Sequence, residues 1–561
     1  MTPRRPPSFL GSTETKFGGG EGQRGRGSTG ARGGHRYAER MDPVVATLAI
    51  LGLAVVAFVS NRVPIGVVAI GVALALFFTG VLTLDQALAG FGDPTVLFIA
   101  GLFVVSESLD ATGVTAWAGQ QVIGRAGTGR TRLIVVVGLL VAVLSALISI
   151  NGAVAALLPL VVVVAARAGM PASRFLIPLA FAASAGSLLL LTGTPVNIVV
   201  SQFAADNGGR AFGYFEFAIV GVPLVIGTVI ILVLGGRLLP DRAGAVMPVD
   251  LVRHVRLLRS EYSVSLDTGV LLGPSNGVTE VVVAPRSPLI GARLCAGMTT
   301  PEGDVVVLAA RRGDEELKGA EFTVQAGDAL LLQGAWDDLE RRSTDPGVLA
   351  VDPPARLRRS VPLGTGAKRA LMVLAAMIVL LATGLVPPAA AALLAACALV
   401  LTRTVSGTQA YQSISWTTIV LIAGMIPLST AFTETGAADL LADGMLSLLG
   451  TASPYLALLA LSLITLVLGQ LISNTATVLI VAPIALAVAT TMEVSIQPFM
   501  MALTVAGAAA FFTPIATPAN LMVMQPGGYR FGDYWRLGLP LSLIVLVAGV
   551  PLIMAFWPLG H

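Results

Sequence analysis

The chain has 561 residues, of which 55% are hydrophobic and only 12% are charged, and its mean hydropathy is +0.84. Soluble globular domains carry about 25% charged residues, so this composition excludes a soluble enzyme and predicts a protein that crosses the membrane many times. The positions of the two cysteines and of the three histidines predict no disulfide and no metal centre, and the net charge of +3 is uninformative by itself. We expect no nucleic-acid partner.

Residues 1–40 form the first distinct segment of the chain. They are rich in glycine and contain seven arginines, without any apolar periodicity. Such a composition cannot bury enough apolar surface to fold, so it predicts disorder. The first apolar run begins only at Val44, which is too late for a signal peptide.

The rest of the chain divides into two membrane regions and a polar insert. From Val44 to about Leu239, and again from about Ala370 to Trp557, apolar runs of about 17–22 residues alternate with short polar breaks, as a bilayer core requires. Between them the composition becomes charged and strand-like. We therefore expect a first membrane repeat over 41–240, a small α/β domain over 249–355 and a second membrane repeat over 367–561.

The two membrane regions are related in sequence. Shifting the chain by 323 positions aligns Val63–Gly113 with Val386–Gly436 without a gap and gives 16 identities in 51 positions. Further along, Thr194-Pro195-Val196-Asn197 aligns with Thr517-Pro518-Ala519-Asn520 at the same offset. These polar and proline anchors are hard to explain by apolar composition alone, so we interpret them as an internal duplication.

The distribution of arginine indicates how the two repeats are oriented. Breaks that carry Lys or Arg face the cytoplasm, and the arginine-bearing breaks of the second repeat alternate in the opposite sense to those of the first. This fits five crossings per repeat, a number that inverts the second repeat relative to the first. It places the insert in the cytoplasm and both termini outside.

An external tail with seven arginines contradicts that rule. A chain that starts at Met41 satisfies it. We expect either that translation starts at Met41 or that one more crossing exists.

Two polar stretches interrupt the apolar runs of each repeat. They are Ser149-Ile150-Asn151 and Thr194–Asn197 in the first repeat, and Ser473-Asn474-Thr475 and Thr517–Asn520 in the second. The regions 133–166 and 453–492 contain no Asp, Glu, Lys, Arg or His. Each region is predicted to form a re-entrant hairpin, whose two short arms meet at the polar tip.

Such tips have a specific chemistry. Backbone that leaves a helix inside the membrane must line a cavity or pack against protein, because unsatisfied amides in hydrocarbon cost several kcal/mol. The freed carbonyls and the Ser, Thr and Asn oxygens suit Na⁺, and the N-termini of half-helices favour an anion. A single such motif is more often a kink or an interhelical hydrogen bond. Its repetition in both halves favours a binding site.

Carboxylates are scarce in the membrane regions. Glu107 and Asp110 lie near the end of one span and Glu434 lies at the matching end of its partner. We expect these groups to be interfacial rather than proton carriers, and we expect no carboxylate near the tips.

The pairing of Ser-Asn-Thr with a later Thr-Pro-x-Asn in each repeat resembles the divalent anion/sodium symporter family of dicarboxylate, citrate and sulfate transporters, part of a wider ion-transporter superfamily. The resemblance covers about 44–240 and 367–560. It implies an all-α polytopic membrane protein of two inverted repeats, each with about five crossings and a re-entrant hairpin. It also implies a homodimer. The first repeat departs from the pattern, because Ile150 stands where an asparagine is expected.

The resemblance also implies roles for single residues. The substrate-binding residues would be Ser149, Asn151, Thr194, Pro195, Asn197, Ser473, Asn474, Thr475, Thr517, Pro518 and Asn520. The cation-binding residues would be Ser145, Ser149, Asn151, Ser473 and Asn474. Because Ile150 offers no amide oxygen, the ion stoichiometry stays open.

The insert has a likeness of its own. Val278–Leu294, Asp304–Arg312 and Phe322–Gly334, followed by a helical Trp336–Arg342, resemble the RCK C-terminal (TrkA-C) domain. Ser260–Asp267 is interpreted as the remnant of a second copy. The likeness implies a regulatory module that binds a ligand or dimerises, and a purely structural insert is an equally good interpretation.

We therefore expect a multi-pass secondary transporter of the inner cell membrane rather than an enzyme. It would carry a small anion, with Na⁺ as the coupling ion and no other cofactor, and its partners would be the anion and the lipid bilayer. Two alternatives remain open, an RCK-regulated cation channel and a sodium/proton exchanger on the same fold. The sequence lacks a Thr-Val-Gly-Tyr-Gly filter, which disfavours the channel.

Overall fold

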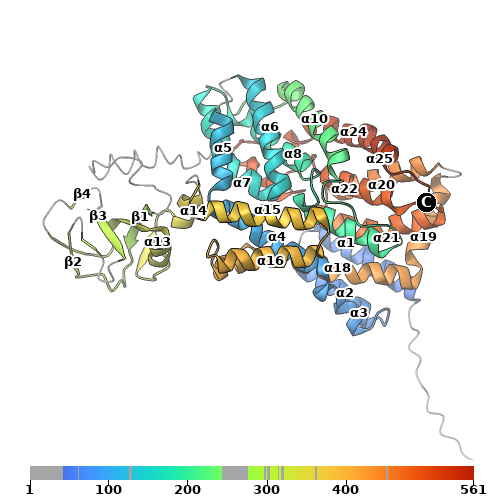
Figure 1. Ribbon diagram of the computed structural model, residues 1–561, viewed down its shortest axis with the longest axis horizontal. Coiled ribbons are helices and arrows are strands. Elements are labelled where there is room, and N and C mark those ends of the chain that lie inside the picture. The colour runs from blue at the N-terminus through green and yellow to red at the C-terminus, as the bar shows by residue number, and fades with distance from the viewer. Residues whose placement is uncertain are drawn as a thin grey trace, which may run out of the picture. The chain divides into compact units, whose positions relative to one another are not determined.

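The computed structural model describes residues 42–60, 62–124, 129–242, 276–295, 298–299, 304–313, 315–317, 321–359, 363–364, 366–449 and 453–560. The glycine- and arginine-rich segment 1–40 and the segment Ser260–Asp267 lie outside these residues. The described chain consists of two sets of helices, one before and one after a small β-sheet domain (Figure 1).

The first set contains ten α-helices. They are α1 (Pro43–Ser60), α2 (Ile65–Phe78), α3 (Leu84–Leu88), α4 (Pro94–Ala111), α5 (Val114–Gly124), α6 (Arg130–Leu147), α7 (Ile150–Arg167), α8 (Leu176–Gly186), α9 (Pro195–Asp206) and α10 (Ala218–Leu234). Short 3₁₀ turns, η1 (Ala89–Gly92), η2 (Ala172–Arg174), η3 (Leu191–Gly193) and η4 (Gly235–Arg237), connect some of them.

The second set repeats this order. It contains α15 (Ala367–Thr383), α16 (Pro388–Leu401), α17 (Gly407–Ser413), α18 (Trp416–Thr435), α19 (Ala437–Leu449), α20 (Pro454–Leu468), α21 (Asn474–Thr491), α22 (Ile496–Ala508) and α23 (Pro518–Met524), then η5 (Phe531–Asp533) and α24 (Trp535–Ile544), the π-helical η6 (Val545–Gly549) and α25 (Val550–Phe556).

Matching helices begin and end at matching positions. Shifting α2 by 323 positions gives the bounds of α16, and shifting α7 by 324 positions gives the bounds of α21. The local signals repeat as well. Thr83 and Ser406, again 323 apart, each form a capping box with a glutamine three residues later. Gly113 and Gly436, with φ of 68° and 73°, provide the left-handed turn after α4 and α18.

The two sets pack against each other reciprocally. Helix α2 lies against α18, and its counterpart α16 lies against α4 (Figure 1). A methyl group on Gly101 of α4 would stand 2.9 Å from the backbone of Ala392, and one on Gly424 of α18 would stand 2.7 Å from the backbone of Ala69. Since 101 and 424, and likewise 69 and 392, are 323 apart, these two close backbone contacts are copies of each other.

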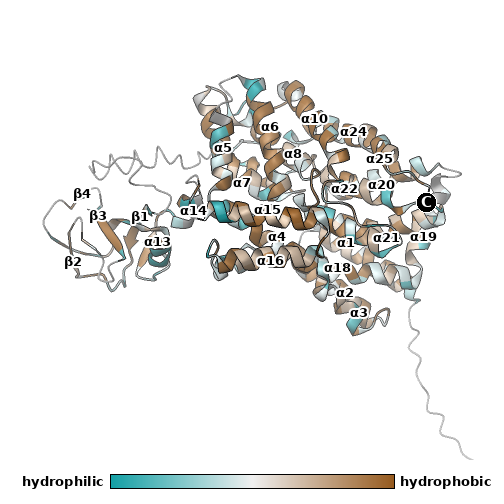
Figure 2. Cartoon of the chain, viewed as in Figure 1, coloured by the Kyte–Doolittle hydropathy of each residue, from teal (hydrophilic) through white to brown (hydrophobic). Residues whose placement is uncertain are grey.

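Six helices in the described part of the chain are long and apolar enough to cross a membrane, and seven shorter apolar helices accompany them. Most of these helices are hydrophobic along their whole length (Figure 2). Large apolar side chains such as Leu53, Phe78 and Leu401 are 70%, 78% and 83% exposed. Exposed apolar surface on this scale belongs in lipid, so the helical sets form a multi-pass membrane protein.

The insert forms a separate sheet domain. Its strands β1 (Asn276–Val283), β3 (Val305–Arg312), β4 (Glu315–Glu316), β6 (Ala329–Ala335) and β7 (Val348–Ala350) build one antiparallel sheet in the order β4-β3-β6-β1-β7. A second sheet pairs β2 (Arg293–Leu294) with β5 (Phe322–Thr323), and helices α13 (Trp336–Ser343) and α14 (Pro354–Arg359) follow. This agrees with the small strand-rich insert expected from the sequence.

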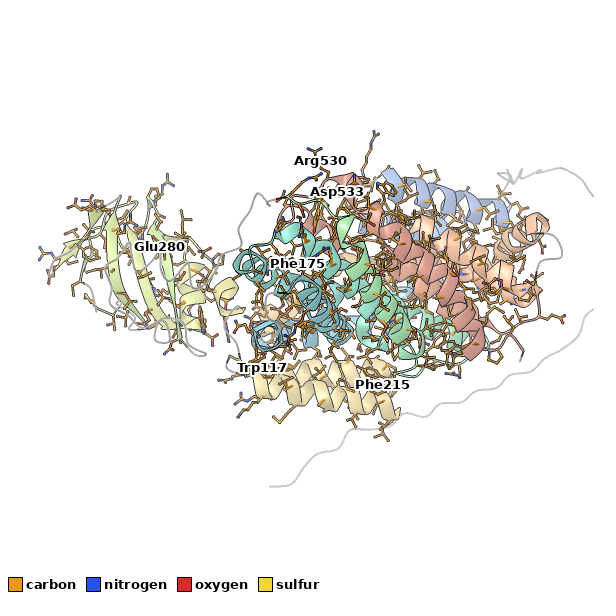
Figure 3. The ribbon with its side chains drawn as sticks, turned by 90° about the horizontal axis from the view of Figure 1, so that it is seen from above. Trp117, Phe175, Phe215, Glu280, Arg530 and Asp533 are labelled. Carbon is orange, nitrogen blue, oxygen red and sulfur yellow. The ribbon has the colours of Figure 1, made fainter. Side chains whose placement is uncertain are left out.

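Two ion-pair clusters join the halves of the helical region. Arg242, after α10, donates a 2.6 Å hydrogen bond to Asp533, whose carboxylate also accepts the backbone N–H of Arg530; Arg530 and Asp533 lie side by side in Figure 3. Elsewhere Arg210 pairs with Glu216, and the indole of Trp557 donates a 2.7 Å hydrogen bond to the same carboxylate. The first cluster therefore links the end of the first set of helices to η5, and the second links the loop after α9 to the residue that follows α25.

Candidate functional site

Both predicted hairpins are broken at their polar tips. Only Ile148 and Ser149 separate α6 from α7, and the residues 469–473 separate α20 from α21. Ser149 Oγ accepts the backbone N–H of Gly152 at 3.1 Å, and Ser473 Oγ accepts that of Ala476 at 3.3 Å. The two serines are thus the N-caps of the second arms, so α7 and α21 begin at the tips.

The Thr-Pro-x-Asn motifs start helices α9 and α23. Thr194 and Thr517 occupy the N-cap positions, with proline at the first helical position of each helix. Thr517 also caps with its side chain, because its Oγ1 accepts the N–H of Asn520 at 3.2 Å.

The asparagine of each motif holds the preceding break in place. In both repeats its amide nitrogen donates to two backbone carbonyls of the non-helical stretch. These bonds join Asn197 to Ser187 (2.9 Å) and Leu190 (2.8 Å), and Asn520 to Ala510 (2.8 Å) and Thr513 (3.1 Å). The two pairs of carbonyls are 323 residues apart, so the arrangement is the same in both repeats.

Each motif packs against the hairpin of the other repeat. Helix α9 contacts α21 and α22, and α23 contacts α7 and α8. Each motif helix is therefore held by elements of the opposite repeat.

Four oxygens in these elements are buried without a hydrogen-bond partner among the described residues. They are Asn197 Oδ1, Asn474 Oδ1, Thr477 Oγ1 and Asn520 Oδ1. Buried polar atoms are nearly always paired in folded proteins, so a group of unpaired oxygens indicates a place for a ligand or water. Neutral amide and hydroxyl oxygens are donors that suit a hard monovalent cation.

The other predicted residues vary in exposure. Ser149, Thr194, Pro195 and Thr475 are partly buried, Thr517 is buried, and Asn151 and Pro518 are exposed. Ser145 is fully buried, and its hydroxyl contacts the carbonyl oxygens of Ala142 (3.0 Å) and Ala183 (2.8 Å). This side chain therefore joins α6 to α8.

Gln470 is a residue of the second tip that the sequence patterns did not assign to the site. Its Nε2 donates to the carbonyls of Leu466 and Ala509, both at 3.0 Å, and its Oε1 accepts the N–H of Phe512 at 2.9 Å. The side chain fastens the second tip to the break before α23. In the sequence, the signal for this role is a glutamine with a long amide side chain at the start of the polar tip.

One carboxylate lies at the first tip, contrary to expectation. Asp110, near the end of α4, is partly buried, and a methyl group on Gly152 would stand 3.1 Å from its Oδ2. The expectation that no carboxylate stands near the tips is therefore wrong for Asp110.

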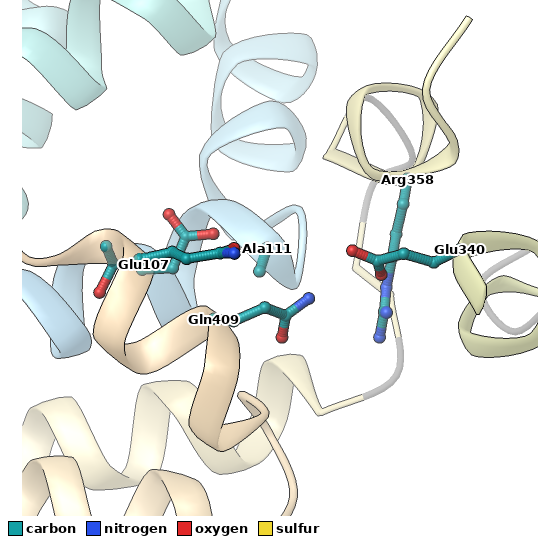
Figure 4. A pocket seen from close by; sticks show the side chains of 7 residues that line it. Glu107, Ala111, Glu340, Arg358 and Gln409 are labelled. Carbon is teal, nitrogen blue, oxygen red and sulfur yellow. The ribbon is translucent and has the colours of Figure 1, made fainter. Parts of the chain in front are cut away.

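A cavity of about 140 Å³ lies at the end of α4 (Figure 4). It is lined by Glu107, Ala111, Glu340, Arg358, Gln409, Gln412 and Ser413. None of these residues belongs to a tip or to a Thr-Pro-x-Asn motif. Among the described residues, no cluster of three or more His, Cys, Asp or Glu side chains could hold a metal ion.

Comparison with known proteins identifies similar sequences along most of the chain. The profile of the CitMHS family, described as citrate transporter, matches residues 55–506 and 449–560. The "Uncharacterized transporter YfbS" of Escherichia coli (strain K12) is 30% identical over 92% of this chain and 99% of its own length. "Sodium/sulfate cotransporter 1" of Chlamydomonas reinhardtii is 26% identical over 52% of this chain and 31% of its own length.

The chain also resembles the solved structure of a transporter. The YdaH transporter of Alcanivorax borkumensis aligns with 93% of this chain and 100% of its own, with a TM-score of 0.49 and 16% identity.

Proposed function

Because the chain belongs to the CitMHS citrate transporter family, we propose that it is a secondary active transporter of a small di- or tricarboxylate or of sulfate, coupled to Na⁺. The members of this family are transporters in the membrane, so the open questions are the substrate, the coupling ion and the residues that bind them.

The observation that carries the proposal is the arrangement of the four unpaired oxygens. Helix α9, which bears Asn197, packs on α21, which bears Asn474 and Thr477. Neutral oxygens of both repeats therefore lie on elements that contact each other, and they are available to one or more cations. Ser473 and Asn474 at the second tip, and Ser149, Asn151 and Ser145 at the first, are the proposed cation ligands.

The anion is proposed to bind between the tips. The N-termini of α7, α9 and α21 carry partial positive charge, and all three begin at the polar breaks. The hairpin regions 133–166 and 453–492 contain no Lys, Arg or His. The negative charge of the substrate would therefore be balanced by helix ends, hydroxyls and the bound Na⁺. The proposed substrate-binding residues of the second repeat are Ser473, Asn474, Thr475, Thr517, Pro518 and Asn520. Those of the first repeat are Ser149, Asn151, Thr194, Pro195 and Asn197.

The repeats are proposed to be inverted, in a homodimer in the inner cell membrane with the insert in the cytoplasm. The insert is proposed to be an RCK C-terminal-like regulatory domain. A cavity of about 200 Å³ in the insert supports a ligand-binding role. It is lined mainly by apolar residues, and the charged residues Arg342 and Asp345 also line it. If the insert is regulatory, a variant that destabilises its sheet should change the rate of uptake without changing which anion is taken up fastest.

The test is uptake of labelled citrate, succinate and sulfate into proteoliposomes, with and without an inward Na⁺ gradient. We expect saturable uptake of at least one anion, accelerated by Na⁺, and at least a tenfold lower rate in Asn474→Ala. Asn207→Ala is the matched control, because Asn207 lies outside the tips and donates one hydrogen bond to the carbonyl of Phe203. Unchanged uptake in Asn474→Ala would refute the site, and uptake indifferent to Na⁺ would refute the coupling.

A further inference from the structure

The two hairpin tips differ at the residue that follows the capping serine. At an offset of 324, Ser149 and Ile150 correspond to Ser473 and Asn474. Asn474 carries a buried oxygen without a hydrogen-bond partner in the described chain, whereas Ile150 carries only hydrocarbon. The first tip therefore lacks a side-chain oxygen that the second tip has.

Asp110 stands beside this deficient tip. Helix α4 contacts α7, and a methyl group on Gly152 would lie 3.1 Å from Asp110 Oδ2 and 3.2 Å from Ser149 Oγ. The carboxylate and the capping hydroxyl therefore flank the same point on the first turn of α7. Asp110 Oδ1 is itself buried.

The second repeat has no buried carboxylate at the corresponding position, because Glu434, next to it, is exposed and accepts a 2.7 Å hydrogen bond from Gln86. Thr433 lies 323 residues after Asp110, is exposed, and hydrogen-bonds to the carbonyl of Ser429 at 2.8 Å. The partly buried carboxylate thus occurs in the repeat that has isoleucine directly after the capping serine, whereas the repeat that has asparagine there carries Thr433 in place of Asp110.

We propose that Asp110, together with Ser149, forms a Na⁺ site at the first tip in which the carboxylate replaces the amide oxygen that Ile150 cannot supply. This inference rests on the proposed cation-coupled transport and assigns its first ion to a residue of α4. A buried cation beside a carboxylate is electrically neutralised, whereas one held by neutral oxygens is not. The first tip consequently binds Na⁺ without the anion, and the second tip binds it only with the anion.

A purely structural role for Asp110 makes a different prediction. A carboxylate near the N-terminus of α7 stabilises the helix through its dipole, with or without Na⁺. Removing its charge would then lower the unfolding temperature equally in sodium and choline salts. If Asp110 binds Na⁺ instead, the unfolding temperature of wild type is higher in the sodium salt than in the choline salt, and this difference disappears when the charge of Asp110 is removed.

The experiment measures ²²Na⁺ binding and thermal unfolding of the full-length purified protein without substrate, in NaCl and in choline chloride at equal ionic strength. Wild type is expected to bind Na⁺ and to unfold at a higher temperature in NaCl. Asp110→Asn is expected to bind Na⁺ at least tenfold more weakly and to lose the difference between salts. Adding Ile150→Asn to this variant restores an amide oxygen at the tip and should recover part of the binding.

Glu107→Gln, one turn earlier on α4, is the matched control and should behave as wild type. Equal destabilisation of Asp110→Asn in both salts, with unchanged ²²Na⁺ binding, would overturn the proposal and leave only the helix-dipole role. Uptake measurements separate this failure from that of the proposed function. If Asn474→Ala abolishes Na⁺-driven uptake while Asp110→Asn binds Na⁺ normally, the transporter stands and the Asp110 site falls.

Discussion

In each repeat a single asparagine amide satisfies backbone groups that the helix break has released. Asn197 and Asn520 are both fully buried, and each donates two hydrogen bonds to carbonyls seven and ten residues earlier. Inside a membrane these carbonyls have no water to replace a lost partner. The asparagine therefore fixes the shape of the break, and its remaining oxygen is left available to a ligand.

We predict that Asn520→Ala destabilises the protein by about 2–5 kcal/mol, because two buried carbonyls lose their donor. Chemical unfolding in mixed micelles measures the free energy of unfolding. Asn207→Ala, which removes one partly buried hydrogen bond, should cost less than about 1.5 kcal/mol. Equal costs for the two variants would show that Asn520 does not support the break.

The sequence predicted which residues stand at the breaks but not what they contact. The Thr-Pro-x-Asn spacing and the polar tips were visible as interruptions of apolar runs. Which carbonyls Asn520 bonds is decided by how the chain turns back before α23. No local sequence pattern predicts this turn. Asp110 was taken as interfacial because its position near the end of a span hides its approach to Gly152, 42 residues later, which only the packing of α4 on α7 creates.

At the scale of elements, local signals set where helices begin, whereas the strands of the insert depend on distant pairings. Repeated signals such as the capping boxes at Thr83 and Ser406 define where helices begin in both repeats. In the insert, Gly327, with φ of 88°, provides a turn before β6, but the strand order β4-β3-β6-β1-β7 depends on pairings between distant residues. Asp328 fixes this turn, since its carboxylate accepts hydrogen bonds from Arg312 at 2.8 Å and from the N–H of Gln325 at 2.8 Å.

We predict that the insert becomes less stable in acid, because Asp328, which fixes this turn, becomes protonated. Burial alone would raise the pKa of Asp328, but the hydrogen bonds from Arg312 and Gln325 outweigh it and hold the pKa below its ordinary value. The stabilisation is therefore complete above the unfolded pKa of about 4 and is lost as the pH falls through the lower, folded value.

The measurement is amide hydrogen exchange of β3 and β6 in the full-length protein from pH 7 to pH 3, corrected for intrinsic rates. Asp328→Asn should exchange faster than wild type at pH 7 and lose less protection on acidification. Asp337→Asn is the control, because its carboxylate is 79% exposed and pairs with Arg358 at the surface. A wild-type pH profile in Asp328→Asn would contradict the prediction.

At the scale of the whole molecule, the duplicated halves are joined by contacts that occur twice. The close approaches of Gly101 to Ala392 and of Gly424 to Ala69 bring α4 onto α16 and α18 onto α2. The duplication was predicted from the sequence, but this crosswise pairing was not, because an alignment of two halves does not say which half each helix packs against.

We predict that Gly101→Val and Gly424→Val destabilise the protein by similar amounts, at least about 1–3 kcal/mol, because the added side chains overlap backbone atoms that cannot move aside. Gly71→Val is the control, since nothing lies within 4 Å of a methyl group at Gly71. Thermal unfolding monitored by size-exclusion chromatography reports the effect. Unfolding temperatures equal to that of Gly71→Val would show that the helices do not approach this closely.

The packing of each Thr-Pro-x-Asn helix on the opposite hairpin has a consequence for biosynthesis. The chain is made from its N-terminus, so α7 is complete long before α23, whose last residue Met524 is made 357 residues after Arg167, the last residue of α7. During that interval the first polar tip lies in the bilayer without its permanent neighbours. A chain that ends before α23 therefore leaves part of α7 without the contact that it has in the full-length protein, and we expect such a fragment to be less stable.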